Sequence, residues 1–240
     1  SAQTVLEGLK KLEYRGYDSW GIAIKPMGVN KLQVEKHVGK IGQATTSLPK
    51  GSIAIGHTRW ATHGGVTDAN AHPHLDCSGQ IAVLHNGIVE NYQELKAKLL
   101  AKGHVFISET DTEVIAHLIE EKQKTAKIET AVFETFKELA GSNAIAVLDS
   151  KTESVIACRN GSPLVVGMGK EDYYLASDVP AFLKFTNAVH FLLDGEAVIL
   201  TKIGVSLHDV ETHAKKNLVI QRLDWKVEDA EKGGYPHFLL

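Results

Sequence analysis

The chain has 240 residues, enough for one large domain with a substantial core, and its 26 Lys and Arg against 29 Asp and Glu give a formal net charge of −3. This near balance offers no electrostatic basis for binding nucleic acid or an anionic membrane surface. The apolar runs fall far short of the roughly 20 residues that span a bilayer, and the N-terminus lacks the layout of a signal peptide. We therefore expect a cytoplasmic protein that acts on a small molecule.

The chain is predicted to open on an amphipathic helix that Ser1 or Thr4 could cap, because apolar residues recur at helical spacing at Val5, Leu6, Leu9 and Leu12. Patterns of period two then predict strands at residues 21–24, 32–38, 52–58 and 81–85. Helical patterns follow at residues 92–101, 112–121 and 128–139. Strand patterns return at residues 144–149, 155–159, 164–168, 173–177, 190–193, 196–201 and 204–208.

Strands that come in runs, with the helices grouped between them, favour antiparallel sheets covered by helices over a doubly wound parallel sheet. We expect an α+β fold in four layers, an α/β/β/α sandwich, with residues 1–223 forming a single domain. The charged tail 224–240 is predicted to be a linker. Cys77 and Cys158 lie far apart and lack CxxC spacing, so both are expected to be reduced.

Chemically useful side chains gather where the predicted strand at 52–58 ends. Arg59 could aim its planar guanidinium at a carboxylate, and a surface or structural salt bridge is the alternative. Trp60 is either a core anchor or a lid over a pocket. Thr62 and His63 supply a hydroxyl and an imidazole beside two glycines, which let the backbone approach a ligand closely.

Two later motifs complete a candidate site. Asn86-Gly87 after a strand predicts either a hairpin turn or an oxyanion hole, in which the Asn86 amide and the Gly87 N–H face a developing negative charge. Asp111 could cap the following helix or bind a substrate ammonium group. A cation, an anion and amide donors together can hold a zwitterionic amino acid and stabilise an oxyanion on its side chain. The sequence therefore predicts amide hydrolysis.

The sequence gives less support to a metal site or to a serine-hydrolase active site. Zinc commonly binds His, and five histidines precede or line these motifs: His57, His63, His72, His74 and His85. The chain contains no HExxH pair, so we interpret these residues as core or supporting histidines and expect neither a metal nor a cofactor. The segment 161–163 lacks the GxSxG elbow of serine hydrolases.

Four motifs occur in one order along the chain: Glu-Tyr-Arg-Gly-Tyr-Asp-Ser at 13–19, His-Thr-Arg-Trp-Ala-Thr-His-Gly at 57–64, His-Asn-Gly-Ile-Val-Glu-Asn at 85–91 and Ser-Glu-Thr-Asp-Thr-Glu-Val at 108–114. In this order they resemble the glutaminase domains of the glutamine:fructose-6-phosphate aminotransferase family, which are class II amidotransferases of the N-terminal-nucleophile hydrolase fold. The resemblance covers nearly the whole chain. It implies that Arg59 binds the α-carboxylate of glutamine and Asp111 its α-amino group, with Thr62 and His63 lining the same pocket.

The resemblance also assigns the remaining roles. Asn86 and Gly87 would form the oxyanion hole, Trp60 would be a mobile gate, and Arg15 and Gly16 would support the surroundings of the nucleophile. Members of the family begin with Cys-Gly-Ile-Phe-Gly or a close variant on a strand ahead of the first helix, and the free α-amine is the general base for the thiol. Here Ser1 stands at the start of that helix, so we expect the chain as written to be inactive as a glutaminase.

For the intact parent, the resemblance implies hydrolysis of L-glutamine to glutamate and ammonia, and transfer of the ammonia to fructose 6-phosphate to give glucosamine 6-phosphate. Residues 234–240 resemble the linker into isomerase domains of the same parent chain, and the parent is expected to be a homo-oligomer. One alternative is a catalytically silent glutamine-binding or interaction module. A metal-dependent hydrolase is a third hypothesis.

Overall fold

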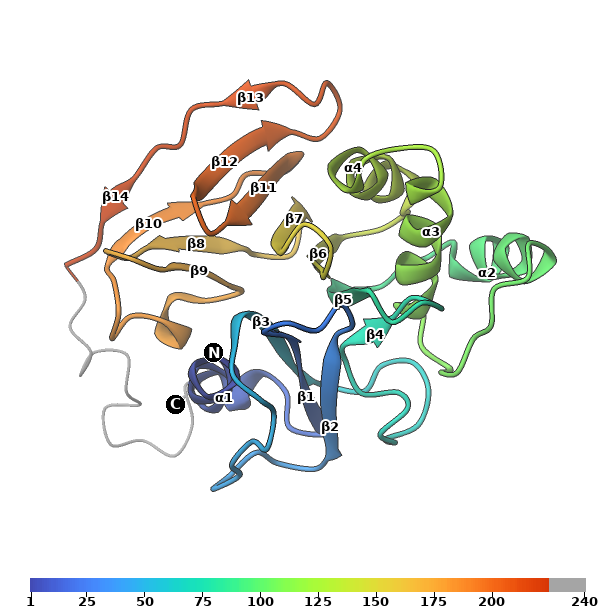
Figure 1. Ribbon diagram of the computed structural model, residues 1–240, viewed down its shortest axis with the longest axis horizontal. Helices are drawn as coiled ribbons and strands as arrows, with labels where there is room; N and C mark the ends of the chain where they lie inside the picture. Colours follow the sequence, from blue (N-terminus) through green and yellow to red (C-terminus); the bar gives the residue numbers. More distant parts are fainter. Residues whose placement is uncertain (225–240) are drawn as a thin grey trace.

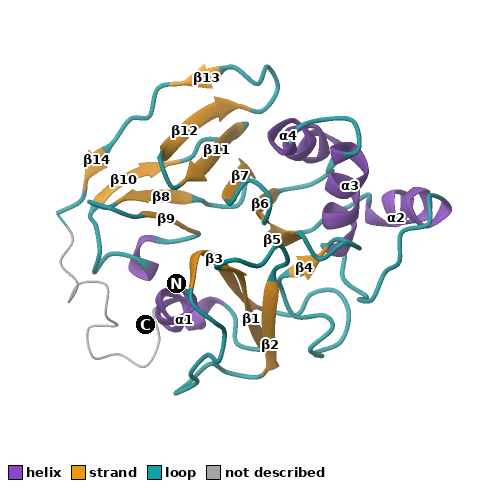
Figure 2. Cartoon of the chain, in the orientation of Figure 1, coloured by secondary structure: helices purple, strands orange, loops and turns teal. Residues whose placement is uncertain are grey.

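Two layers of β-sheet lie between layers of helices in the computed structural model, which describes residues 1–224 (Figure 1). Helix α1 (Ala2–Leu12) covers one side, and α2 (Tyr92–Ala101), α3 (Glu113–Gln123) and α4 (Ile128–Glu138) lie together on the other (Figure 2). Ser1 caps α1, since its Oγ accepts a hydrogen bond from the Thr4 N–H at 3.2 Å. The cap and the three later helices were all predicted.

The strands form three sheets. The first has the order β2-β1-β3 and consists of β1 (Ser19–Pro26), β2 (Gln33–Val38) and β3 (Gly51–Arg59). The second has the order β14-β10-β8-β9 and consists of β8 (Val165–Met168), β9 (Tyr173–Ala176), β10 (Ala188–Phe191) and β14 (Gln221–Arg222). Short 3-10 helices, η1 (Glu13–Arg15) and η2 (Val179–Ala181), precede β1 and β10.

The third sheet has seven strands and forms the second β-layer. In the order β13-β12-β11-β7-β6-β5-β4 it consists of β4 (His74–Leu75), β5 (Ile81–Gly87), β6 (Asn143–Asp149), β7 (Ser154–Asn160), β11 (Glu196–Thr201), β12 (Gly204–Asp209) and β13 (Lys215–Lys216). Every strand pair among residues 1–224 is antiparallel, as predicted.

The central strands of the seven-stranded sheet are buried on both faces, because their alternate side chains enter two different cores. In β6, Ile145 and Val147 pack with α2, α3 and α4. Their neighbours Ala144, Ala146 and Leu148 pack instead against the other sheets. A further core holds α1 against β1. This alternation produces the four-layer α/β/β/α sandwich that the sequence predicted.

One predicted alternative is wrong, because Asn86 and Gly87 do not form a hairpin turn. They are the last two residues of β5 and pair with Ala144 and Asn143 of β6. The β6 strand, which is distant in sequence, extends the ladder through a dipeptide whose local preference is a turn. The seven-stranded sheet thereby places both residues at the end of β5.

The remaining predictions concern the cysteines and the tail. Cys77 and Cys158 are both free thiols, as expected. Within the described part of the chain, no helix is both long and apolar enough to cross a membrane. The predicted linker at 224–240 lies outside the described residues from position 225 onward, and the domain boundary stays a prediction.

Candidate functional site

A pocket of about 160 Å³ opens where the ends of β3 and β5 meet the segment that leads into α3. Pockets for drug-sized ligands measure about 300–1,000 Å³, so this one suits a smaller metabolite. It is lined by Arg15, His57, Thr58, Arg59, Trp60, Thr62, His63, His72, His85, Asn86, Gly87, Thr110, Asp111 and Thr112. All the predicted site residues except Gly16 are therefore brought together in one place.

Gly16 lies directly behind the pocket wall. A Cβ at this position would be 3.0 Å from the carbonyl carbon of Arg59 and 3.0 Å from the Trp60 nitrogen. Glycine thus lets the end of η1 pack against the end of β3. Asp18 holds the same junction, because its N–H donates to the Arg59 carbonyl at 3.0 Å and its carboxylate accepts from the Ala61 N–H at 2.9 Å.

Arg59 is buried, with 4% of its surface exposed. Its guanidinium donates to the carbonyl oxygens of His63 and, at 3.1 Å, Gly65, so it organises the loop that follows β3. Burial lowers the pKa of Arg59, while the charges of Asp18 and Asp111 raise it. The guanidinium remains cationic near pH 7. No carboxylate among residues 1–224 forms a salt bridge with Arg59, so the predicted alternative of a structural salt bridge is wrong.

Asp111 supplies a buried carboxylate to the same pocket. Its Oδ2 accepts a hydrogen bond from the Val89 N–H at 2.8 Å, which ties it to the segment after β5. The cap residue of α3 is Thr112, so the alternative that Asp111 caps this helix is wrong. The pocket therefore contains a carboxylate as well as a guanidinium, the two charges that a zwitterion requires.

Asn86 has a fixed orientation because its Oδ1 lies 2.8 Å from His57 Nε2. Burial lowers the pKa of His57 to about 4, although the Asn86 hydrogen bond raises it, so the imidazole is neutral near pH 7. An amide oxygen only accepts, so His57 Nε2 carries the proton and donates it. The amide nitrogen of Asn86 is then left as a hydrogen-bond donor at the pocket.

Gly87 has a φ of +128°, a conformation that residues with a side chain rarely adopt. A Cβ here would also stand 2.0 Å from the Ser142 carbonyl oxygen. Two independent requirements therefore call for glycine at the position next to Asn86.

Sequence reasoning missed Thr112, which connects the buried histidines around the pocket. Its Oγ1 lies 2.9 Å from His72 Nε2 and 3.0 Å from His85 Nδ1. His85 Nε2 in turn lies 2.8 Å from Asn143 Oδ1. Burial lowers the pKa of both histidines, which supports their interpretation as neutral core residues. The only sequence signal was the position of Thr112 beside Asp111.

Trp60 and Arg15 lie at the rim of the pocket. Trp60 is 57% exposed, and its ring centroid lies 5.4 Å from that of Tyr17, so the core-anchor alternative is wrong. Arg15 Nη1 donates to the Ser177 carbonyl at 3.2 Å and lies 3.8 Å from an Asp178 carboxylate oxygen. The rim is thus joined to the segment that follows β9.

The family described as "Glutamine amidotransferase domain" matches residues 57–184, which is more than half of the chain. The chain belongs to this family. It is 50% identical to the glutamine–fructose-6-phosphate aminotransferase [isomerizing] of Pyrococcus horikoshii, over 100% of this chain and 41% of that protein. The corresponding enzyme of Thermus thermophilus is 48% identical over 100% of this chain and 40% of its own length. The chain thus spans about two fifths of these curated relatives.

Among solved structures, the glutamine phosphoribosylpyrophosphate amidotransferase from B. subtilis matches with a TM-score of 0.75 and 28% identity. The match covers 90% of this chain and 47% of that one. Together with the antiparallel sheets and flanking helices, it confirms the α+β amidotransferase fold expected from the four motifs.

Proposed function

We propose that this domain hydrolyses the side-chain amide of L-glutamine to glutamate and ammonia. The observation that carries the proposal is the combination, in one small pocket, of the Arg59 guanidinium, the Asp111 carboxylate and the Asn86 amide. A zwitterion needs a cation for its carboxylate and an anion for its ammonium, and a reacting amide needs donors where its oxygen becomes negative. Membership of the glutamine amidotransferase family supports the same reaction.

In this proposal, Arg59 binds the α-carboxylate of glutamine and Asp111 binds its α-amino group. The side-chain amide then extends towards Asn86. Other residues complete the pocket, with Thr62 and His63 in its wall, Trp60 as a gate at its mouth, and Arg15 and Gly16 as supports for the surroundings of the nucleophile.

The resemblance implies that the nucleophile is the thiol of an N-terminal cysteine, whose free α-amine takes the thiol proton. Attack of sulfur on the amide carbon turns the carbonyl oxygen into an oxyanion that Asn86 Nδ2 and the Gly87 N–H stabilise. Loss of one such donor typically costs about 3–4 kcal/mol of barrier. The amine then protonates the leaving nitrogen, ammonia departs, and water hydrolyses the thioester to glutamate.

We further propose that, in the parent protein, the ammonia passes to fructose 6-phosphate held by isomerase domains of the same chain, giving glucosamine 6-phosphate. The support for this step is the name of the relatives and the fact that this chain spans 41% of one and 40% of another. The cytoplasmic location and the homo-oligomeric parent stay predictions.

A catalytically silent glutamine-binding module would share the two charged contacts. The Asn86 amide, oriented by His57 at 2.8 Å, would serve either proposal, because the side-chain carbonyl of bound glutamine also accepts a hydrogen bond. The two proposals differ in their product, because only hydrolysis releases ammonia.

The test measures ammonia release from L-glutamine by a protein in which Cys-Gly-Ile-Phe-Gly precedes Ser1. We expect Arg59→Lys and Asp111→Asn each to raise KM at least about tenfold, since a charge-assisted hydrogen bond contributes about 1.5–3 kcal/mol. The exposed Arg222→Lys and Asp172→Asn variants are the controls. Glutamine binding without ammonia release would support the silent module, and unchanged KM values would remove Arg59 and Asp111 from the binding site.

A further inference from the structure

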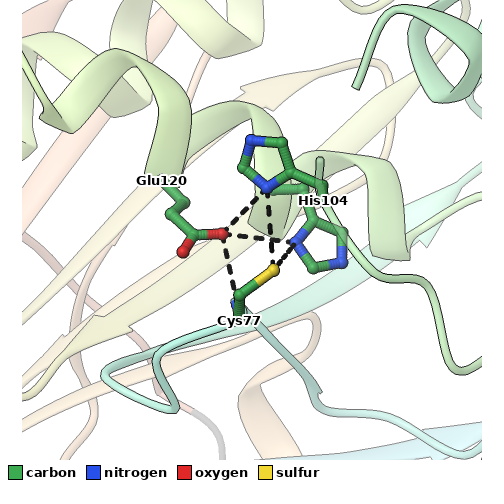
Figure 3. A group of neighbouring side chains, drawn as sticks. Cys77, His104 and Glu120 are labelled. Carbon is green, nitrogen blue, oxygen red and sulfur yellow. Dashed lines mark hydrogen bonds and ion pairs between the residues drawn. The ribbon is translucent and has the colours of Figure 1, made fainter. Parts of the chain in front are cut away.

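A second group of side chains meets outside the pocket, and Figure 3 shows Cys77, His104 and Glu120 pointing toward one another from separate segments. The group consists of Cys77, His104, His117 and Glu120. We propose that these four residues bind one Zn²⁺ ion in a structural site that fastens the turn between β4 and β5 to helix α3. None of them was a candidate ligand in the sequence prediction, and the inference does not rest on the proposed glutaminase activity.

The four ligand atoms all lie within 4.8 Å of one another, and four of the six distances between them are close to those of a tetrahedral zinc site. Cys77 Sγ lies 3.7 Å from His104 Nδ1 and 3.5 Å from His117 Nδ1. Glu120 Oε2 lies 3.0 Å from His104 Nδ1 and 3.4 Å from His117 Nδ1. Zn–S bonds of about 2.3 Å and Zn–N or Zn–O bonds of about 2.0–2.2 Å, at tetrahedral angles, place neighbouring ligand atoms about 3.3–3.6 Å apart. The four atoms are thus close to the spacing that coordination requires.

The second nitrogens of both histidines lie near carboxylates, and the His104 contact is a hydrogen bond. His104 Nε2 lies 3.1 Å from Glu121 Oε2, and His117 Nε2 lies 3.5 Å from Glu113 Oε1. Histidines that bind a metal usually present their second N–H to a carboxylate, which fixes the tautomer and the orientation of the ring. Both rings therefore direct Nδ1, the nitrogen free to bind a metal, towards the centre of the group.

A count of hydrogen atoms also calls for a cation at this centre. With the imidazole protons on the Nε2 atoms, near Glu121 and Glu113, both Nδ1 atoms present lone pairs. Glu120 Oε2 already accepts a hydrogen bond from the Cys77 N–H, so the Cys77 thiol has one hydrogen to offer two Nδ1 atoms, and the two histidines are 7% and 1% exposed. Buried acceptors without donors are costly, and a bound metal ion satisfies all of them at once.

The turn that carries Cys77 has a defined shape. The Asp76 carboxylate accepts hydrogen bonds from the N–H groups of Ser78 at 3.2 Å, Gln80 at 2.8 Å and Ile81 at 2.8 Å. The Cys77 N–H itself donates to Glu120 Oε2 at 3.2 Å. Since Cys77 is exposed, an ion can reach the site from solvent without unfolding of the chain.

The other ligands are equally well fixed. His104 follows the C-terminus of α2, where Gly103 has a φ of +89° and the His104 N–H donates to the Leu99 carbonyl at 3.1 Å. His117 and Glu120 are three residues apart on α3, so they lie on the same face of that helix. The helix presents two ligands, and the turn and the α2 terminus present one each.

The donor set selects the metal and the role. A thiolate and two imidazoles suit Zn²⁺ and do not suit Mg²⁺ or Ca²⁺, which prefer oxygen ligands. Four protein ligands fill a tetrahedron and leave no position for water or substrate, as in structural zinc sites. Binding displaces the Cys77 thiol proton to solvent. The ion would stabilise α3, whose cap residue Thr112 follows Asp111 in the chain.

The experiment uses tag-free protein that has been treated with a chelator and then titrated with Zn²⁺ or Co²⁺. We expect one equivalent of Zn²⁺ to bind with a Kd well below about 1 µM, as four ligands allow, and to raise Tm. Cobalt should give tetrahedral absorption bands together with a thiolate-to-cobalt charge-transfer band. Cys77→Ala should abolish that band and weaken Zn²⁺ binding at least about a hundredfold, whereas Cys158→Ala, which removes the other thiol, should change neither.

Two results would overturn the inference. One is a folded wild-type protein that binds Zn²⁺ no more tightly than Cys77→Ala does. The other is a charge-transfer band that persists in Cys77→Ala or disappears in Cys158→Ala. Because every readout is metal binding, spectroscopy or Tm, a failed glutaminase assay would leave these outcomes unaffected.

Discussion

His57 determines which way Asn86 can act, since its Nε2 donates to the amide oxygen at 2.8 Å and leaves the amide nitrogen at the pocket. At the scale of single residues, this is the contact on which the proposed chemistry depends most. The donor can be the neutral Nε2–H tautomer, because burial lowers the pKa of His57 to about 4.

We expect Asn86→Ala to reduce kcat about 10²–10³-fold with little change in KM, because an oxyanion donor acts mainly in the transition state. Alanine keeps the strand backbone of β5. The measurement is steady-state ammonia release by the protein with the leading cysteine. Asn160→Ala, at the exposed end of β7, is the matched control and should leave both constants unchanged. Near-normal turnover in a folded Asn86→Ala variant would leave Gly87 as the only donor of the pair.

Strand β5 ends at Gly87, a position that its surroundings restrict to glycine. At the scale of elements, Gly87 lets the final pair of the ladder form beside the carbonyl of Ser142, only 2.0 Å from where a Cβ would stand. Gly28 also has a positive φ, of +72°, but a Cβ there would meet nothing within 4 Å. Gly87 combines a positive φ with a steric clash, whereas Gly28 has the positive φ alone, so comparing the two positions distinguishes the two effects.

Gly87→Ala should lower the free energy of unfolding by about 2–4 kcal/mol, since backbone strain and overpacking each cost about 1–3 kcal/mol. Gly28→Ala should cost only about 1–2 kcal/mol, the price of the conformation alone. Urea unfolding of both variants and the wild type measures the difference. Equal losses would mean that the chain around Ser142 moves aside easily.

Long elements could be predicted because periodicity defines them. The helical pattern at 92–101 became α2 with the same bounds, and the pattern at 196–201 became β11. The two-residue strands β4, β13 and β14 were missed, because two residues have no period. Asn86-Gly87 gave a correct local signal for a turn that tertiary pairing overrode.

The candidate site was predicted where a contiguous motif carried it, and missed where separate segments had to meet. Arg59, Asn86 and Asp111 each stand in a motif, and all three line the pocket. Thr112 gains its meaning only from contacts with His72 and His85. The proposed zinc ligands come from three separate segments, which no spacing rule within the sequence brings together.

At the scale of the whole molecule, the buried histidines make the stability of the fold depend on pH. Burial lowers the pKa of His57 to about 4 and that of His74 to about 3, from ordinary values of 6.5. Between pH 6.5 and the lowered values, the unfolded chain binds protons that the folded chain does not. The stability gained from neutral histidines is therefore complete above about pH 6.5 and is lost as the pH falls towards 4.

We expect the free energy of unfolding to fall on acidification from pH 7 to pH 4, with at most about 3 kcal/mol of the loss due to His57. His57→Gln removes this titration and should flatten the profile. His37→Gln, whose side chain is 48% exposed, is the control and should change the slope much less. Urea unfolding at a series of pH values tests this, and identical slopes for wild type and His57→Gln would contradict it.

The pocket is assembled from residues far apart in the chain, from Arg15 on η1 to Thr112 before α3. Closing the loops between such distant segments costs conformational entropy, so an unfolded chain does not present the complete pocket. A ligand in this pocket consequently recognises only chains that have finished folding. Its binding free energy is added to the native state alone, in proportion to the logarithm of its concentration above Kd. A supply of substrate would thus also protect the newly made domain.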